Sequence, residues 1–212
     1  MFKNMQIAAR MILSYMLIIA LMIITGIVSI VMLNRVGNAL EEFHDTAFLT
    51  VENSWKGKRA IALLRANLLQ ATLEQNDTLA NSYISEARTN YQTTKETATA
   101  LRDTYQGNRS NLDNLDSLIN QINPMVEQLY TYALNNDMDR GYAYLVNTYQ
   151  PIANQIRDSF DNIGTEADER ATNRVTEGSN LSNVASILQV ILIIISIIFA
   201  LVLAISMSNG IT

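Results

Sequence analysis

The sequence has no cysteine and holds only 1 histidine, 2 prolines and 8 glycines among its 212 residues. The absence of cysteine excludes a disulfide framework, a thiolate metal site and a cysteine nucleophile. The scarcity of turn-forming residues excludes collagen-like and multi-hairpin β architectures, which need many of them. We therefore expect an all-α protein with long helices, and we expect neither a metal nor another cofactor.

Catalytic signatures are also missing. The sequence contains no glycine-rich phosphate loop, no Ser-His-Asp set and no HExxH motif. Its formal net charge is −5, and all 20 acidic residues lie between two apolar runs. An acidic segment is a poor partner for nucleic acid. We expect a protein that is not an enzyme and that does not bind nucleic acid.

Two uncharged apolar runs, 11–33 and 187–207, match the roughly 20 residues that a transmembrane helix needs. Lys3 and Arg10 precede the first run, which predicts a cytoplasmic N-terminus. That run is longer than the apolar core of a signal peptide and offers no small-x-small cleavage site, so we interpret it as an uncleaved anchor. The second run returns the chain to the cytoplasm. The two runs together predict a two-pass protein of the inner or plasma membrane with both termini cytoplasmic.

The predicted organisation has five parts: 1–10 cytoplasmic, 11–33 transmembrane, 34–183 extracytoplasmic, 184–207 transmembrane and 208–212 cytoplasmic. Within the extracytoplasmic part, apolar residues at helical spacing and the absence of proline predict one helix over 34–75. Asn76 and Asp77 predict a break and an N-cap before a second helix over 78–106.

Ser110 or Asn111 begins the third predicted helix, which the polar cluster 135–137 stops. The fourth starts near Asp139, is bent or interrupted at Pro151, and runs on into the second apolar run. These lengths predict an up-down-up-down four-helix bundle whose first and fourth helices are continuous with the two transmembrane helices.

The residues Lys3-Asn4-Met5 near the start and Ser208-Asn209-Gly210-Ile211-Thr212 at the tail, together with this architecture, resemble the front half of a bacterial methyl-accepting chemotaxis protein with a four-helix-bundle sensor domain. The resemblance implies a homodimeric receptor that binds a small extracellular ligand. It also implies that the second span passes the signal to a HAMP domain beyond Thr212, which acts on the cytoplasmic chemotaxis kinase complex.

The candidate ligand residues lie on the first and fourth bundle helices. Tyr149 and Gln150 belong to a Tyr-Gln-Pro sequence that resembles the Gln-Pro element by which amino-acid-sensing chemoreceptors help bind their ligand. Arg59 and Arg65, with Lys58 nearby, are the available counterparts of the arginines that such receptors present from the first helix. Since a guanidinium can capture a carboxylate through two hydrogen bonds, we expect an organic acid or amino acid as ligand.

Other interpretations stay open at this point. Each of these basic residues could instead form a structural salt bridge with a neighbouring helix, and Trp55 could hold Arg59 through a cation–π contact. The same architecture also suits the sensor part of a histidine kinase or a diguanylate cyclase. A third hypothesis is a membrane-anchored dimerisation or interaction bundle with no small ligand.

Overall fold

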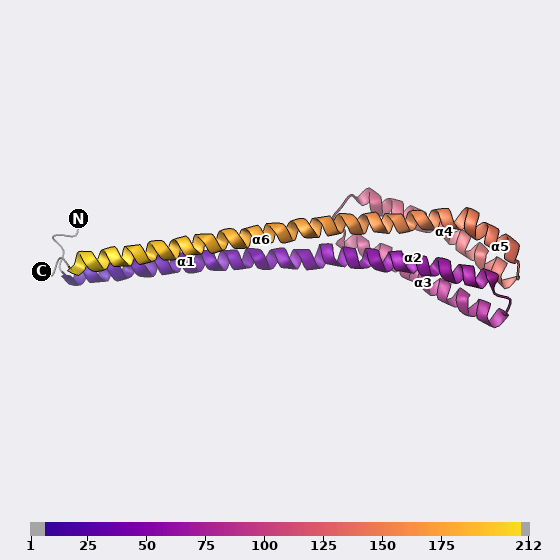
Figure 1. Ribbon diagram of the computed structural model, residues 1–212, viewed down its shortest axis with the longest axis horizontal. Coiled ribbons are helices and arrows are strands. Elements are labelled where there is room, and N and C mark those ends of the chain that lie inside the picture. The colour runs from indigo at the N-terminus through magenta and orange to yellow at the C-terminus, as the bar shows by residue number, and fades with distance from the viewer. Residues whose placement is uncertain (1–6, 209–212) are drawn as a thin grey trace. The chain divides into compact units, whose positions relative to one another are not determined.

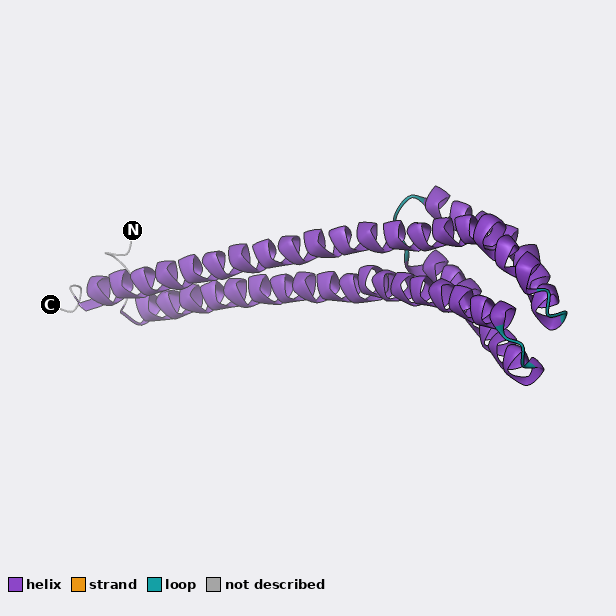
Figure 2. Cartoon of the chain, turned by 45° about the vertical axis from the view of Figure 1, so that its right-hand side comes forward, coloured by secondary structure: helices purple, strands orange, loops and turns teal. Residues whose placement is uncertain are grey.

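A computed structural model describes residues 7–208, and all of them are helical except short loops and turns (Figures 1 and 2). The expected sequence features Lys3-Asn4-Met5 and 209–212 lie outside the described residues. In chain order the elements are α1 (Ile7–Glu42), the π-helical segment η1 (Phe43–Phe48), α2 (Leu49–Leu73), α3 (Asp77–Thr104), α4 (Arg109–Leu134), α5 (Met138–Tyr144), the π-helical segment η2 (Leu145–Tyr149) and α6 (Gln150–Ser208). The expected all-α class is confirmed over this range.

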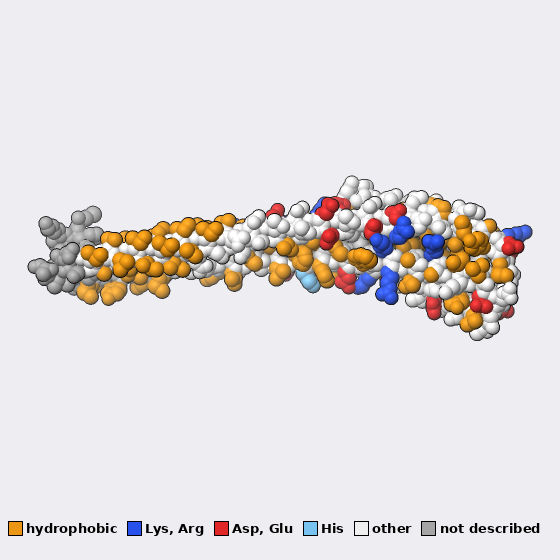
Figure 3. Space-filling model, in the orientation of Figure 1, with side chains coloured by type: hydrophobic (Ala, Val, Ile, Leu, Met, Phe, Trp, Pro, Cys, Tyr) orange, Lys and Arg blue, Asp and Glu red, His pale blue; other side chains and the backbone are white. Residues whose placement is uncertain are grey.

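The chain divides into two compact units, one comprising Met1–Glu41 with Arg174–Thr212 and the other Glu42–Asn173. In the first unit, hydrophobic side chains cover the visible face of α1 and of the last part of α6 (Figure 3). Two helical stretches, Met11–Leu73 and Met138–Val202, contain segments long and apolar enough to cross a membrane, and no residue of those apolar segments is buried within the chain. Both properties suit helices that face lipid.

The second unit is a bundle of α2, α3, α4 and the first part of α6. Three of its helices each carry a row of buried residues that recur at alternating intervals of three and four, an average period of about 3.5 that favours knobs-into-holes packing. In α2 these residues are Thr50, Ser54, Gly57, Ile61, Leu64, Leu68 and Ala71. In α4 they are Leu112, Leu115, Ile119, Ile122, Val126, Leu129 and Ala133. In α6 they are Ala153, Ile156, Phe160, Ile163 and Ala167.

Side-chain caps define the starts of α3 and α4. The Asn76 side-chain oxygen accepts hydrogen bonds from the backbone N–H groups of Thr78 at 3.0 Å and Leu79 at 3.2 Å. The predicted break and N-cap at Asn76 are therefore confirmed. Asn108 caps α4 in the same way, through the N–H of Ser110 at 3.0 Å, so this helix starts slightly earlier than the sequence suggested.

We expect Asn76→Ala to lower the free energy of unfolding of the bundle by about 1 kcal/mol, since an uncapped helix leaves two backbone donors without this acceptor. Chemical denaturation of the full chain in detergent, followed by far-UV circular dichroism, measures the change. Gln75→Ala, at an exposed neighbouring position, is the matched control and should change stability by less than about 0.5 kcal/mol. Equal effects of the two substitutions would contradict the capping role.

Two π-helical segments interrupt the regular helices. The helix predicted over 34–75 is helical up to Leu73, but its hydrogen-bond pattern changes to that of a π-helix at η1, between α1 and α2. A π-turn contains one residue more than an α-turn, and hydrophobic spacing alone does not reveal it. The second segment, η2, ends two residues before Pro151, which lacks a backbone donor, so the expected interruption of the fourth helix lies directly ahead of this proline.

Polar contacts tie the α3–α4 connection to α6. Tyr105 donates its hydroxyl hydrogen bond to the carboxylate of Glu166, and Asn111 donates to the Tyr105 oxygen at 2.9 Å. Arg170 donates to the backbone carbonyl of Gln106 at 2.6 Å. Burial and the neighbouring Glu166 raise the pKa of Tyr105, which keeps this hydroxyl a donor.

Candidate functional site

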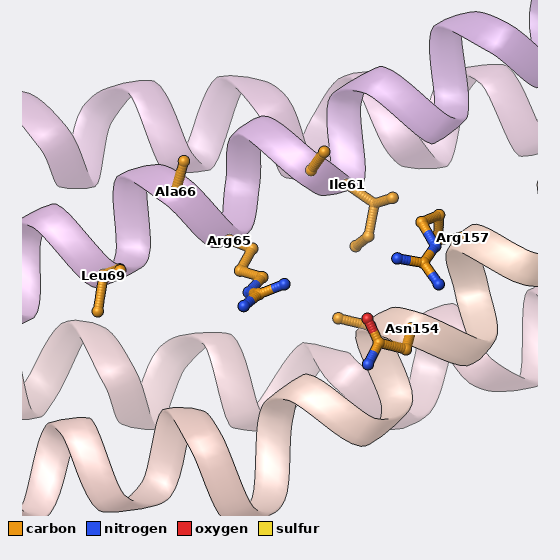
Figure 4. Close-up of a pocket in the computed structure, with 8 residues that line it drawn as sticks. Ile61, Arg65, Ala66, Leu69, Asn154 and Arg157 are labelled. Carbon is orange, nitrogen blue, oxygen red and sulfur yellow. The ribbon is translucent and has the colours of Figure 1, made fainter.

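A pocket of about 300 Å³ lies between α2 and α6 within the bundle. On α2, Ile61, Arg65 and Leu69 are spaced by four and so share one helix face. On α6, Asn154 and Arg157 are spaced by three and likewise share a face. Figure 4 shows Arg65 directed from α2 toward the gap into which Asn154 and Arg157 project from α6. We call this pocket the Arg65 groove.

The Arg65 groove is positively charged. Arg65 is half-buried and forms no ion pair with any residue that the structure describes. Arg157 donates from Nε and Nη2 to Oδ1 of its neighbour Asp158, at 3.1 and 2.8 Å. Two guanidinium groups and an amide therefore line one groove with a single carboxylate beside them, an arrangement that suits an anionic guest able to accept several hydrogen bonds.

Tyr149 lies in the core and does not line the groove. Its side chain is fully buried, and its hydroxyl has no hydrogen-bond partner among the described residues. Burial raises the pKa of Tyr149 well above its ordinary value, the nearby Tyr130 raises it further, and the positive charge of Arg65 opposes the shift. Burial likewise raises the pKa of Tyr130 to about 12. The predicted ligand residue Tyr149 thus lies within electrostatic reach of Arg65, on the inner side of the bundle.

The other predicted ligand residues are not brought into the groove. Gln150, half-buried, is the first residue of α6 and does not line this pocket. Arg59 is exposed on α2 and forms no ion pair among the described residues. Of the five predicted residues, the structure places only Arg65 in the groove.

Lys58 occupies a different environment. Its ammonium pairs with Asp161 of α6, which corresponds to the structural salt bridge that the sequence left open. The same ammonium lies 5.1 Å from the centre of the Trp55 ring. The cation beside Trp55 is therefore Lys58 rather than Arg59, because the i, i+3 position brings Lys58 both over the ring and toward α6.

Sequence reasoning did not identify Asn154 and Arg157. The available signal was their spacing of three beside the buried positions Ala153 and Ile156, which puts them at the edge of the helix face that enters the core. That pattern indicates two polar residues at an interhelical boundary but does not identify the helix opposite.

Two further polar features of the described residues lie outside the Arg65 groove. Arg102 donates to Asp113 at 3.3 Å and from Nε to Asp116 at 3.0 Å, which joins α3 to α4. His44 stacks on Phe48 with ring centres 5.7 Å apart and is exposed. Over the range that the structure describes, no three His, Cys, Asp or Glu residues gather into a metal site.

Comparison with known proteins gives one clear family. A family described as a four-helix-bundle sensory module for signal transduction matches residues 4–181, most of the chain. No curated protein and no solved structure matches the chain. The match covers all of α2 to α5, η2 and the part of α6 that lines the Arg65 groove.

Proposed function

Because the chain belongs to the family of four-helix-bundle sensory modules for signal transduction in chemoreceptors, we propose that it is a transmembrane sensor for a small carboxylate, an organic acid or an amino acid. The observation that carries this proposal is the half-buried guanidinium of Arg65, which faces a groove and has no acidic partner among the described residues. A half-buried guanidinium has lost part of its hydration without gaining a counter-ion, and a ligand carboxylate would compensate for that loss.

In this proposal Arg65 holds the carboxylate through two hydrogen bonds. Arg157 can turn from Asp158 to add a third, and the Asn154 amide serves as donor or acceptor for a further polar group of the ligand. The aliphatic side chains of Ile61 and Leu69 contact the apolar part of the ligand. Arg59, Lys58, Tyr149 and Gln150 remain proposed ligand residues of second rank, and none of them lines the Arg65 groove.

Signalling requires two packings of the bundle that differ in ligand affinity. We propose that the protein works as a homodimer with two membrane spans and both termini cytoplasmic, and that α6 carries the change toward the second span. A HAMP domain and the chemotaxis kinase complex would receive it. Support for this route comes from α6, whose helical assignment runs from Gln150 to Ser208, so that the groove residues and the second apolar run belong to one element.

A thermal-shift screen of the full chain in nanodiscs against amino acids and small organic acids tests the proposal, since a ligand that binds only the folded state raises its melting temperature. We expect a carboxylate to raise the melting temperature in a concentration-dependent manner. Arg65→Met should weaken that binding by roughly tenfold to a hundredfold, because a charged hydrogen-bond donor is lost while the aliphatic stem is kept.

Arg140→Met is the matched control, because Arg140 is an exposed arginine of α5 outside the groove. It should leave carboxylate binding unchanged. Binding that survives Arg65→Met would contradict the assignment of the groove. A panel with no hit would favour an interaction bundle without a small ligand.

A further inference from the structure

A second pocket of about 280 Å³ lies on the bundle between α2 and α6, and it differs in character from the Arg65 groove. Its lining includes Trp55, Lys58 and Ser54 from α2, and Asp161 and Asp168 from α6. Two carboxylates and one ammonium give this lining a net negative charge. An anionic ligand is therefore disfavoured here, and a cationic one is favoured.

The aromatic wall of this pocket is open to an incoming cation. The Trp55 side chain is 65% exposed, which is unusual for the largest hydrophobic residue of a bundle helix. Its ring already has the Lys58 ammonium at 5.1 Å from its centre, within the range of a cation–π contact. Lys58 pairs at the same time with Asp161. The lysine thus shows that an ammonium group fits between an indole ring and a carboxylate at this place.

Two groups of the pocket still lack partners. Ser54 is only 3% exposed, and its hydroxyl has no hydrogen-bond partner among the residues that the structure describes. Asp168 is exposed and forms no ion pair within the described chain. A buried hydroxyl without a partner is disfavoured, and an N–H donor from a ligand would satisfy it. Asp161 and Asp168 are seven residues apart on one helix, about 10 Å, which is too far to share one metal ion.

We propose that this pocket binds a primary alkylammonium ion, in a site distinct from the proposed carboxylate site at Arg65. The ligand ammonium lies against the Trp55 ring and donates hydrogen bonds to Asp168 and to the Ser54 hydroxyl. Its alkyl part contacts the apolar wall of the pocket, which includes Val51. The Lys58 ammonium competes with the ligand, because it already lies over the Trp55 ring and pairs with Asp161, one of the two carboxylates.

The test uses the full chain in detergent micelles and the fluorescence of Trp55, which is the only tryptophan of the sequence. The probe is n-butylammonium chloride, with sodium chloride at equal ionic strength as the salt control. Sodium butyrate, which has the same alkyl chain with the opposite charge, is the ligand control. We expect a saturable change of Trp55 emission with butylammonium only.

Two variants distinguish binding of butylammonium in this pocket from nonspecific binding at the protein surface. Asp168→Asn should weaken butylammonium binding at least fivefold, whereas Lys58→Met should strengthen it several-fold, because the internal competitor is removed. A Lys58→Met variant that binds more weakly than the parent, or an Asp168→Asn variant that binds equally well, would overturn the proposal. A response to butyrate equal to that to butylammonium would do the same.

A third variant tests whether the two proposed sites bind their ligands independently. Arg65→Met should leave the butylammonium response intact, and Asp168→Asn should leave carboxylate binding intact. Failure of the carboxylate screen therefore leaves the ammonium site standing, and loss of the butylammonium response in Arg65→Met would overturn its independence.

Discussion

Gly57→Ala is expected to lower the free energy of unfolding of the bundle by about 2 to 3 kcal/mol, although the same change in most helices is stabilising. A β-carbon at this position would lie 2.3 Å from Cε1 and 2.4 Å from Cζ of Phe160. Phe160 has no exposed surface, so its ring cannot turn away without displacing other core residues. Denaturation of the full chain in detergent, followed by far-UV circular dichroism, measures the loss.

Gly37→Ala is the matched control, because a β-carbon there would meet no atom within 4 Å. That substitution should not destabilise the chain and should favour the helix by about 0.5 to 1 kcal/mol. Phe160→Leu placed on top of Gly57→Ala should recover part of the lost stability, since the smaller side chain makes room. A stabilised Gly57→Ala variant would show that the Phe160 ring does not pack against the α2 backbone.

Raising the pH from 9 to 11 is expected to lower the free energy of unfolding by about 2.5 kcal/mol through Tyr130 and Tyr149 alone. Burial raises the pKa of both hydroxyls, that of Tyr130 to about 12. In the unfolded chain each titrates near 10, so above that pH only the unfolded state loses these protons. The stabilising contribution is fully present below pH 10 and is lost as the pH rises through the folded-state pKa, which is about 12 for Tyr130 and higher for Tyr149. Chemical denaturation at pH 9, 10 and 11 gives the slope.

Substitution separates these two hydroxyls from the other titrating groups. The double variant Tyr130→Phe with Tyr149→Phe should lose most of the expected slope while it stays folded at neutral pH, because both hydroxyls lack hydrogen-bond partners among the described residues. Tyr142→Phe, at an exposed position of α5, serves as the control and should keep the parent slope. An unchanged slope in the double variant would mean that other groups cause the alkaline loss.

The sequence was sufficient for those features of the fold that depend on local chemistry. Asn76 could be assigned as a cap because its side chain bonds to donors two and three residues away. The polar cluster at 135–137 marked the end of α4 for a similar reason, and Asn136 indeed adopts a left-handed backbone with φ of 55°. The π-helical segments could not be predicted, since one extra residue in a turn leaves no compositional trace.

For the candidate site, the sequence identified which residue types matter but not which neighbours they have. Arg65 was predicted because chemoreceptors of the resembled type present arginines from the first helix and a guanidinium can hold a carboxylate. Lys58, predicted beside it, has a different partner, Asp161, which is 103 residues away in the sequence. Asn154 and Arg157 were missed for the same reason, because the face that α6 turns toward α2 is determined by the packing of Phe160 against Gly57.

The η1 segment lies between two apolar patterns, that of α1 and that of α2. A single regular helix would have to satisfy both patterns with one period. In an unbroken α-helix, the direction of every side chain follows from that of the first, so a lipid-facing pattern would dictate the core-facing one. A π-turn adds one residue, about 100° of rotation, without a loop. The π-helical segment Phe43–Phe48 therefore accommodates one extra residue. The apolar positions of α1 and those of α2 need not follow one common helical period. Insertions and deletions of a single residue should be tolerated better here than anywhere within α2.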